Sequence, residues 1–209
     1  MRSIFFFSGL VLSSSALANS AQPQALAEQV KALWQAGYIQ AAQALLSPMV
    51  TKKTKDARLL ALLGQTEALL NNADKAEDLL EKAVKLDSNN ADYQHWYATV
   101  SCNLAASASM FSALGYAKRC KKAYETALKL APENPRSYIA LGSYLAQAPS
   151  IAGGDRGEAL KMVAQLKQLD QLQGELLQLR VSDLADDASF KLLLAETELL
   201  STRPELYFQ

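Results

Sequence analysis

The sequence predicts an all-α fold in which helix-turn-helix pairs stack into an α-solenoid. The first observation is a pattern of small and apolar residues at fixed offsets, which occurs at Cys120, Tyr124, Ala127 and Pro132. The same offsets occur at Ala76, Leu80, Ala83 and Ser88, and more faintly at Ala42, Leu46, Met49 and Thr54. The second observation is the spacing, because Ala76 follows Ala42 by 34 residues, a period typical of stacked helix pairs. We therefore expect about five pairs, two with enlarged connections, over residues 23–56, 57–90, 91–134, 135–173 and 174–209.

Residues 1–18 have the three parts of a secretory signal peptide. Arg2 supplies a charged start, Ile4 to Leu12 an apolar core, and Ala16-Leu17-Ala18 a small-residue cleavage site. The apolar run is shorter than the ~20 residues that span a bilayer, which favours a cleaved signal over a membrane anchor. We expect cleavage after Ala18, export to the periplasm, no membrane insertion afterwards, and a single repeat array over residues 19–209.

The balance of charge argues against a nucleic-acid partner. Lys and Arg together number 21, Asp and Glu together also number 21, and the formal net charge is zero. A face that binds nucleic acid needs an excess of basic residues, and none is evident in this sequence.

The pair 23–56 shows the repeat in its weakest form. One helix is expected over Ala25–Gly37, followed by a turn, and a second over Ile39–Leu46. The second helix should end near Pro48, because proline has no backbone N–H to donate.

The pair 57–90 is the clearest unit. Gly64 and Ala76 are small at positions where the two helices are expected to pass close beside each other. The turn between the helices is predicted at Asn71-Asn72.

The pair 91–134 spans 44 residues, ten more than the period of 34. The additional residues fall in Ala105–Tyr116, an uncharged and weakly amphipathic segment. We expect this segment to extend both helices beyond the body of the array, with Met110, Phe111 and Leu114 packing at the tip.

The pair 135–173 spans 39 residues, five more than the period, and its enlarged connection is Ala148–Glu158. The glycines of Gly153-Gly154-Asp155 suit a structural turn with positive φ angles. A phosphate-binding loop is disfavoured, because no Walker-type Lys-Ser/Thr follows. Asp155 lies three residues before Glu158, the spacing of a capping box, and marks the next helix start.

These residues resemble the tetratricopeptide repeat (TPR) family over residues 23–200. The resemblance is carried by Leu63-Gly64, Ala76, Leu80, Ala83, Tyr124, Ala127, Pro132 and Leu141-Gly142. More narrowly, four stretches resemble a group of exported bacterial TPR proteins without a defined activity: Tyr93–Trp96, Ser109–Phe111, Tyr116–Arg119 and Ala148–Gly154. The resemblance implies a right-handed superhelix whose concave face is lined by the first helix of each pair and holds other polypeptides.

The resemblance also selects a binding groove, because each first helix of a TPR pair turns fixed positions inward. Here those positions carry Lys31, Trp34, Gln35, Arg58, Gln65, Asp92, His95, Thr99, Asn103, Arg136, Ser143 and Gln147. Amides pair with an extended backbone and Trp34 offers a large apolar contact, so a peptide or protein segment is the expected ligand. Arg58 and Arg136 add a modest preference for polar or acidic segments.

One known class of TPR ligand does not fit this groove. TPR proteins that hold C-terminal carboxylates use a Lys/Asn clamp on the concave face. The equivalent places here carry Ala27, Lys31, Ala61, Gln65, His95 and Thr99. The clamp is therefore absent.

His95 is the only histidine of the chain. A zinc site needs several ligands together, and a catalytic triad needs a nucleophile, a base and an orienting group. We therefore expect His95 to line the groove or to fill a helix interface. No catalytic residue, metal or cofactor is expected.

Cys102 and Cys120 are the only cysteines. If the hairpin folds near Met110, they lie eight and ten residues from the turn and come within about one helical turn of each other. A disulfide needs a Cα separation of ~5.5–6 Å, which helices rarely reach, although alanines line this seam. The sequence leaves two states open, a disulfide or two buried thiols.

The leading functional hypothesis is an exported, non-enzymatic scaffold or adaptor that binds a peptide or protein segment in its concave groove. The alternative is a structural subunit that docks through apolar edges in an envelope assembly. Such an edge could be formed by Leu192, Leu193, Leu199 and Leu200. An enzyme or small-ligand receptor would need a polar pocket with clustered carboxylates, and the sequence shows no such constellation.

Overall fold

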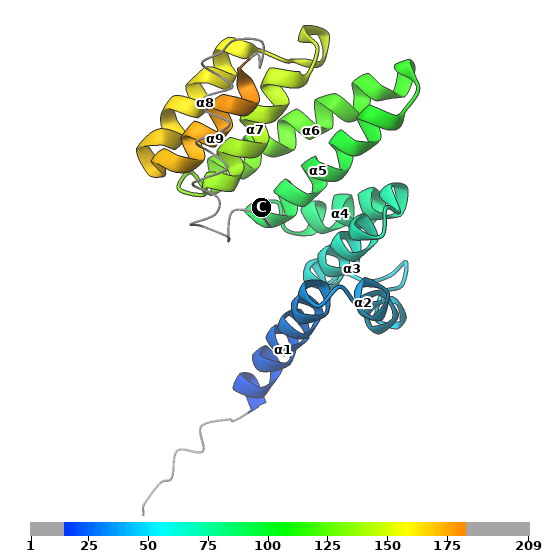
Figure 1. The fold of residues 1–209 in the computed structure, drawn as a ribbon. Coiled ribbons are helices and arrows are strands. Elements are labelled where there is room, and N and C mark those ends of the chain that lie inside the picture. The colour runs from blue at the N-terminus through cyan, green and yellow to red at the C-terminus, as the bar shows by residue number, and fades with distance from the viewer. Residues whose placement is uncertain (1–14, 183–209) are drawn as a thin grey trace, which may run out of the picture.

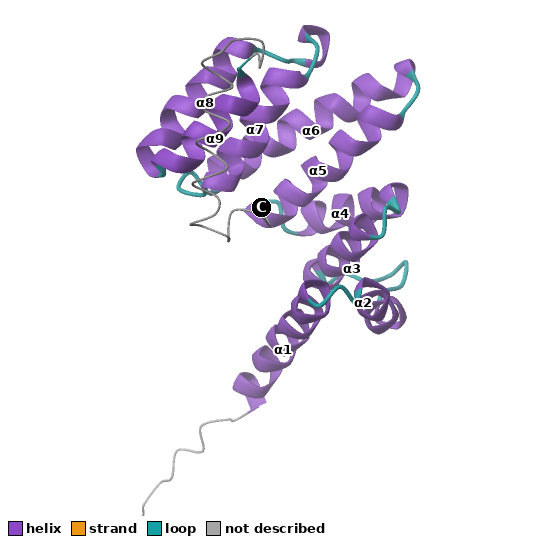
Figure 2. Cartoon of the chain, viewed as in Figure 1, coloured by secondary structure: helices purple, strands orange, loops and turns teal. Residues whose placement is uncertain are grey.

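The computed structural model describes residues 15–182, and this part of the chain is made of helices without any strand. The α-helices are α1 (Ser15–Gln35), α2 (Ile39–Leu46), α3 (Ala57–Leu69), α4 (Ala73–Leu86), α5 (Ala91–Ser107), α6 (Met110–Leu130), α7 (Pro135–Gln147), α8 (Arg156–Leu169) and α9 (Gln171–Val181). Two short 3-10 helices, η1 (Ser47–Met49) and η2 (Ser150–Ala152), lie in connections. Figure 2 shows the helices of this part of the chain joined by loops and turns of different lengths.

The helices form antiparallel pairs that stack in chain order. Within the pairs, α3 packs on α4, α5 on α6 and α7 on α8, and the pairs are joined by contacts of α2 with α3, α4 with α5 and α6 with α7. In Figure 1 the array runs from α1 at one end to α8 and α9 at the other. The all-α solenoid of helix pairs is therefore as predicted. The second half of the predicted pair 174–209 lies outside the described residues.

Helix starts are set by acidic and amide side chains that cap free backbone N–H groups. The Asp56 side chain accepts from the N–H of Arg58 at the start of α3, and Asn90 and Asn134 do the same for α5 and α7. At α8, the Glu158 N–H donates to Asp155 Oδ1 at 3.0 Å. The predicted start of this helix is thus confirmed.

Two glycines let helices approach closely in the core. A Cβ added at Gly64 of α3 would lie 2.8 Å from Leu80 Cγ of α4. A Cβ at Gly142 of α7 would lie 3.0 Å from Leu177 Cδ2 of α9 and 3.3 Å from Met162 Cβ of α8. The prediction that Gly64 is small because the second helix passes beside it is confirmed.

The N-terminal helix is longer than predicted. The sequence predicts a helix over Ala25–Gly37, whereas α1 spans Ser15–Gln35 and so begins before the predicted cleavage point after Ala18. Gly37 ends this helix with a positive φ of 77°, and Asn71, in the predicted turn between α3 and α4, has a φ of 61°. Both residue types tolerate the left-handed region.

The first enlarged connection extends its two helices, as predicted, but its tip differs from expectation. Met110 and Phe111 are 86% and 98% exposed, so the expected packing of these side chains is wrong. In Figure 1 the turn between α5 and α6 lies at the outer edge of the array. Leu114, one turn further along α6, is half-buried.

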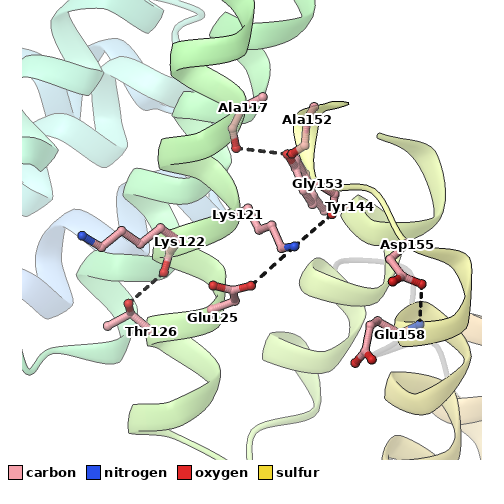
Figure 3. Close-up of polar contacts among 10 residues, drawn as sticks. All are labelled: Ala117, Lys121, Lys122, Glu125, Thr126, Tyr144, Ala152, Gly153, Asp155 and Glu158. Atoms are coloured by element: carbon pink, nitrogen blue, oxygen red, sulfur yellow. Dashed lines mark hydrogen bonds and ion pairs between the residues drawn. The ribbon is translucent and has the colours of Figure 1, made fainter. Parts of the chain in front are cut away.

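The second enlarged connection is a tight turn held against α6. A Cβ at Gly154 would lie 1.7 Å from the Ala148 carbonyl oxygen, and Gly153 has a φ of 88°, so both positions require glycine. Lys121 Nζ of α6 donates to the Gly153 carbonyl at 3.0 Å. The Tyr144 hydroxyl lies 2.6 Å from the Ala152 carbonyl oxygen and 3.0 Å from that of Ala117. Figure 3 shows these side chains tying η2 to the helices.

Candidate binding groove

The first helices of the pairs line a hollow of about 440 Å³ that contains several charged side chains and is here named the charged groove. It contains six of the predicted groove residues, which are Lys31, Trp34, Arg58, Gln65, Asp92 and Arg136. Tyr93 and Trp96 of α5 add aromatic surface to its wall. Side chains from α1, α3, α5 and α7 therefore converge on one hollow, as expected if first helices form the concave face.

Trp34 has a structural role as well as a place in the groove. Its indole N–H donates to Thr66 Oγ1 at 3.2 Å, and the Thr66 hydroxyl donates to the Leu62 carbonyl at 2.7 Å. This chain of hydrogen bonds fixes α1 on α3. The indole ring is half-buried, so only part of it faces the groove.

Each basic side chain of the charged groove has a local partner. Lys31 Nζ lies 3.2 Å from Glu28 Oε1, and Arg58 Nη2 lies 3.2 Å from Asp56 Oδ2. The Arg136 guanidinium lies over the Trp96 ring, 5.5 Å from its centroid, which is a cation–π arrangement. Basic side chains thus outnumber acidic ones in the charged groove, but neighbouring carboxylates already balance the positive charges of Lys31 and Arg58.

His95 lies in a helix interface, which is one of its two predicted places, and it does not line the charged groove. It is 8% exposed, and its ring lies 5.4 Å from that of Tyr124 of α6. Burial first, and the positive charge of Arg136 second, lower the pKa of His95 to about 4, so the imidazole is neutral at physiological pH. Thr99 Oγ1 lies 3.1 Å from the Tyr124 hydroxyl and also faces this interface.

The remaining predicted groove residues are separated from the charged groove. Asn103, Ser143 and Gln147 line a second hollow of about 710 Å³, while Gln35 is exposed at the end of α1 and lines neither hollow. This second hollow, the apolar hollow, is lined mainly by α5, α6, α7 and the η2 turn, and includes Met110, Leu114, Ile139, Pro149 and Ile151. The sequence did not predict this hollow, because the repeat pattern identifies only inward-facing positions of first helices, whereas α6 and the η2 turn supply much of the wall.

A disulfide joins Cys102 of α5 to Cys120 of α6, with a Cα–Cα separation of 5.2 Å. Cys120 is fully buried, and Cys102 lies at the wall of the apolar hollow. Of the two states that the sequence leaves open, the structure contains the bridge, which fixes the extended α5–α6 hairpin.

Residues 15–182 contain neither a cluster of metal-binding side chains nor a membrane-spanning helix. No group of three or more His, Cys, Asp or Glu side chains in that range could hold a metal ion. None of the helices in the same range is long and apolar enough to cross a membrane.

Several solved structures share the fold. TTC0263, a TPR protein of Thermus thermophilus, matches with a TM-score of 0.69 and 16% identity, over 87% of this chain and 92% of that chain. YrrB, described as a TPR protein with an unusual peptide-binding site, matches with a TM-score of 0.56 and 16% identity, over 81% of both chains. A Thermobaculum terrenum O-GlcNAc transferase mutant matches with a TM-score of 0.58 and 22% identity, over 71% of this chain and 26% of that chain.

These likenesses show that the protein has the right-handed TPR solenoid fold predicted from its sequence. No curated protein matches the chain. Residues 27–152, more than half of the chain, match the family described as "Regulator of microtubule dynamics protein 1-3", and the chain belongs to that family.

Proposed function

We propose that this protein is an exported, non-enzymatic scaffold that binds an extended segment of a protein partner in the charged groove. The observation that carries the proposal is the convergence of Lys31, Arg58, Gln65 and Arg136 with two tryptophans on one hollow. These groups suit a peptide ligand, because the Gln65 amide can pair with a peptide backbone and the rings of Trp34 and Trp96 can contact apolar side chains of the peptide.

The charges of the groove favour an acidic or polar segment. Three basic side chains and one acidic side chain, Asp92, line the hollow. Because Lys31 and Arg58 already have carboxylate neighbours, a peptide carboxylate would compete with those neighbours instead of meeting an unpaired charge. The expected preference is therefore modest and weakened by salt. The peptide-binding site named for YrrB, which has the same fold, supports a peptide ligand.

The experiment compares the capture of partners by charge-reversed variants. The groove variant carries Lys31→Glu, Arg58→Glu and Arg136→Glu, and the control carries Lys52→Glu, Lys53→Glu and Lys82→Glu, which are exposed and outside the charged groove. Trp34 is left unchanged because it holds Thr66. Partners captured from envelope extract by the wild-type protein are identified by mass spectrometry, and their affinities are then measured with each variant.

The groove variant should weaken binding at least roughly tenfold, whereas the control should bind like the wild type. Circular dichroism checks that both remain folded. Unchanged binding by the groove variant would remove the groove as the site. It would favour the alternative of docking through apolar edges, whose residues Leu192, Leu193, Leu199 and Leu200 lie outside the described residues.

Export is tested separately by intact-mass measurement of protein recovered from the periplasm. A chain that starts at Asn19, or within one or two residues of it, would support cleavage after Ala18. Full-length protein retained in the cytoplasm would contradict the exported role.

A further inference from the structure

The three most exposed large apolar side chains of the described residues lie on the two enlarged connections. Met110 and Phe111, at the start of α6, are 86% and 98% exposed, and Ile151, in η2, is 77% exposed. Figure 1 shows the α5–α6 and α7–α8 connections projecting at the same edge of the array. Met110 and Ile151 also line the same apolar hollow, so they face one side of the molecule.

The 34-residue repeat does not require exposed apolar side chains at Met110, Phe111 and Ile151. The two connections that carry these side chains are the ones that exceed the 34-residue period, by ten and five residues. In a soluble protein, apolar side chains that gather on one exposed surface mark a site of interaction. Here they protrude from two separate turns, with the apolar hollow between them.

Basic side chains surround one of the two turns. Lys118, Lys121 and Lys122 of α6 frame a shallow hollow of about 330 Å³ that also contains Ile151. Lys121 is held by the Gly153 carbonyl and lies 3.8 Å from Glu125 Oε1, as Figure 3 shows. Neither Lys118 nor Lys122 makes an ion pair with a carboxylate of residues 15–182.

We infer that this edge docks on a membrane surface that carries anionic phospholipids. This surface, here named the membrane-docking edge, consists of Met110, Phe111, Ile151, Lys118 and Lys122. Met110 lies at the start of α6, and Ile151 lies beside the lysines further along the same helix. A membrane that contacts both side chains must therefore also lie close to Lys118 and Lys122. The apolar side chains then enter the interface while Lys118 and Lys122 meet lipid phosphates.

Two observations favour a membrane over a folded protein partner. Phe111 projects from its turn almost fully exposed, and a fluid lipid surface can bury it together with Ile151 on a separate turn without a preformed pocket for either side chain. Lys118 and Lys122, which make no ion pair within residues 15–182, are positively charged and so complement anionic headgroups. The inferred contact is a peripheral one, made by the side chains of this edge. It also leaves the charged groove, which is built from other residues, free for a peptide.

The test is co-sedimentation of the full chain with vesicles. One set contains phosphatidylethanolamine with phosphatidylglycerol, and the other contains phosphatidylcholine alone. The apolar variant is Phe111→Ser with Ile151→Ser, and its control is Tyr38→Ser, an exposed residue of the α1–α2 turn. The basic variant is Lys118→Gln with Lys122→Gln, and its control is Lys52→Gln with Lys53→Gln, in the α2–α3 connection.

All variants share the apolar N-terminal residues, so differences in vesicle binding between variants report on the membrane-docking edge alone. We expect the wild type to bind phosphatidylglycerol vesicles more tightly than phosphatidylcholine vesicles. The apolar variant should bind phosphatidylglycerol vesicles at least roughly tenfold more weakly than the wild type. The basic variant should lose roughly fivefold in affinity for each lysine replaced, and both controls should bind like the wild type.

Three outcomes would overturn the inference. Equal binding of the wild type and the apolar variant to phosphatidylglycerol vesicles would show that the edge does not touch lipid. Equal binding of the wild type to both kinds of vesicle would remove the role of the lysines. An absence of vesicle binding, together with loss of a captured protein partner in the apolar variant, would assign the edge to a protein surface instead.

Discussion

Lys75 Nζ of α4 lies 2.6 Å from Glu67 Oε1 of α3, and the Glu67 side chain is completely buried. Gln43 of α2 donates to both carboxylate oxygens, at 2.9 and 3.0 Å, and Asn72 donates to Oε2 at 2.7 Å. One carboxylate thus joins α2, α3, the α3–α4 turn and α4. Burial pulls the pKa of Glu67 upward, but the hydrogen bonds from Lys75, Gln43 and Asn72 outweigh it and hold the pKa below its usual value.

Replacing Glu67 by Gln should destabilise the array at neutral pH by ~1–3 kcal/mol, because an amide cannot accept from all three donors. The depressed pKa of Glu67 gives stability that is present above the unfolded pKa of about 4.3 and is lost as pH falls through the folded pKa. The difference between the wild type and Glu67→Gln should therefore shrink in strong acid. Urea unfolding at several pH values measures it.

The matched control is Glu81→Gln, because Glu81 is partly exposed and pairs with Lys85 on the surface of α4. Its effect should stay within ~0.5 kcal/mol. An equal loss of stability in both variants would mean that the buried network contributes no more than a surface ion pair.

Gly64→Ala should be strongly destabilising for steric reasons. The new Cβ would lie 2.8 Å from Leu80 Cγ, and Leu80 is fully buried, so α3 and α4 must separate. The expected cost is ~1–3 kcal/mol, seen as a lower Tm. Gly115→Ala is the control, because its Cβ would meet only Arg119 Nη1, at 4.0 Å. That change should be neutral or stabilising by up to ~1 kcal/mol, and a Tm loss equal to that of Gly64→Ala would contradict the close contact.

His95 should make the array sensitive to mild acid. Its pKa is lowered to about 4 by burial first and by Arg136 second, so the unfolded chain, with a pKa near 6.5, binds the proton more readily. Stability is therefore retained above about pH 6.5 and lost as pH falls toward 4, by a total on the order of 3 kcal/mol. Because His95 is the only histidine, its NMR titration is unambiguous. A midpoint near 6.5 in the folded protein would show that the ring is solvated.

The sequence predicted those parts of the fold that depend on local spacing. The 34-residue period locates the helix pairs, and the three-residue spacing of Asp155 and Glu158 marks the start of α8. Gly64 was interpretable because close crossing of two helices excludes larger side chains at a known repeat position. In each case the physical cause lies within one repeat unit.

Contacts between units could not be predicted in the same way. Trp34 and Thr66 are 32 residues apart, and Gln43 and Glu67 are 24 apart, so their pairing depends on how adjacent pairs are rotated against each other. Met110 and Phe111 were expected to pack because apolar side chains usually do. Whether a neighbouring segment reaches the tip depends on the length of the other connections, which the repeat pattern does not determine.

The bridge between Cys102 and Cys120 gives the last prediction. The two residues are 18 apart in sequence, and closing a loop of this size restricts the unfolded chain enough to stabilise the native state by ~3 kcal/mol. Protein purified from the periplasm without reductant should show no alkylated cysteine by mass analysis. Adding reductant, or replacing Cys102 by Ala, should lower the Tm by a similar amount. In the Cys102→Ala variant, reductant should have no further effect, which separates loss of the bridge from a general effect of the reagent. Two alkylated cysteines in the untreated protein would show that the thiols stay reduced, leaving Cys120 as a small residue packed in the core.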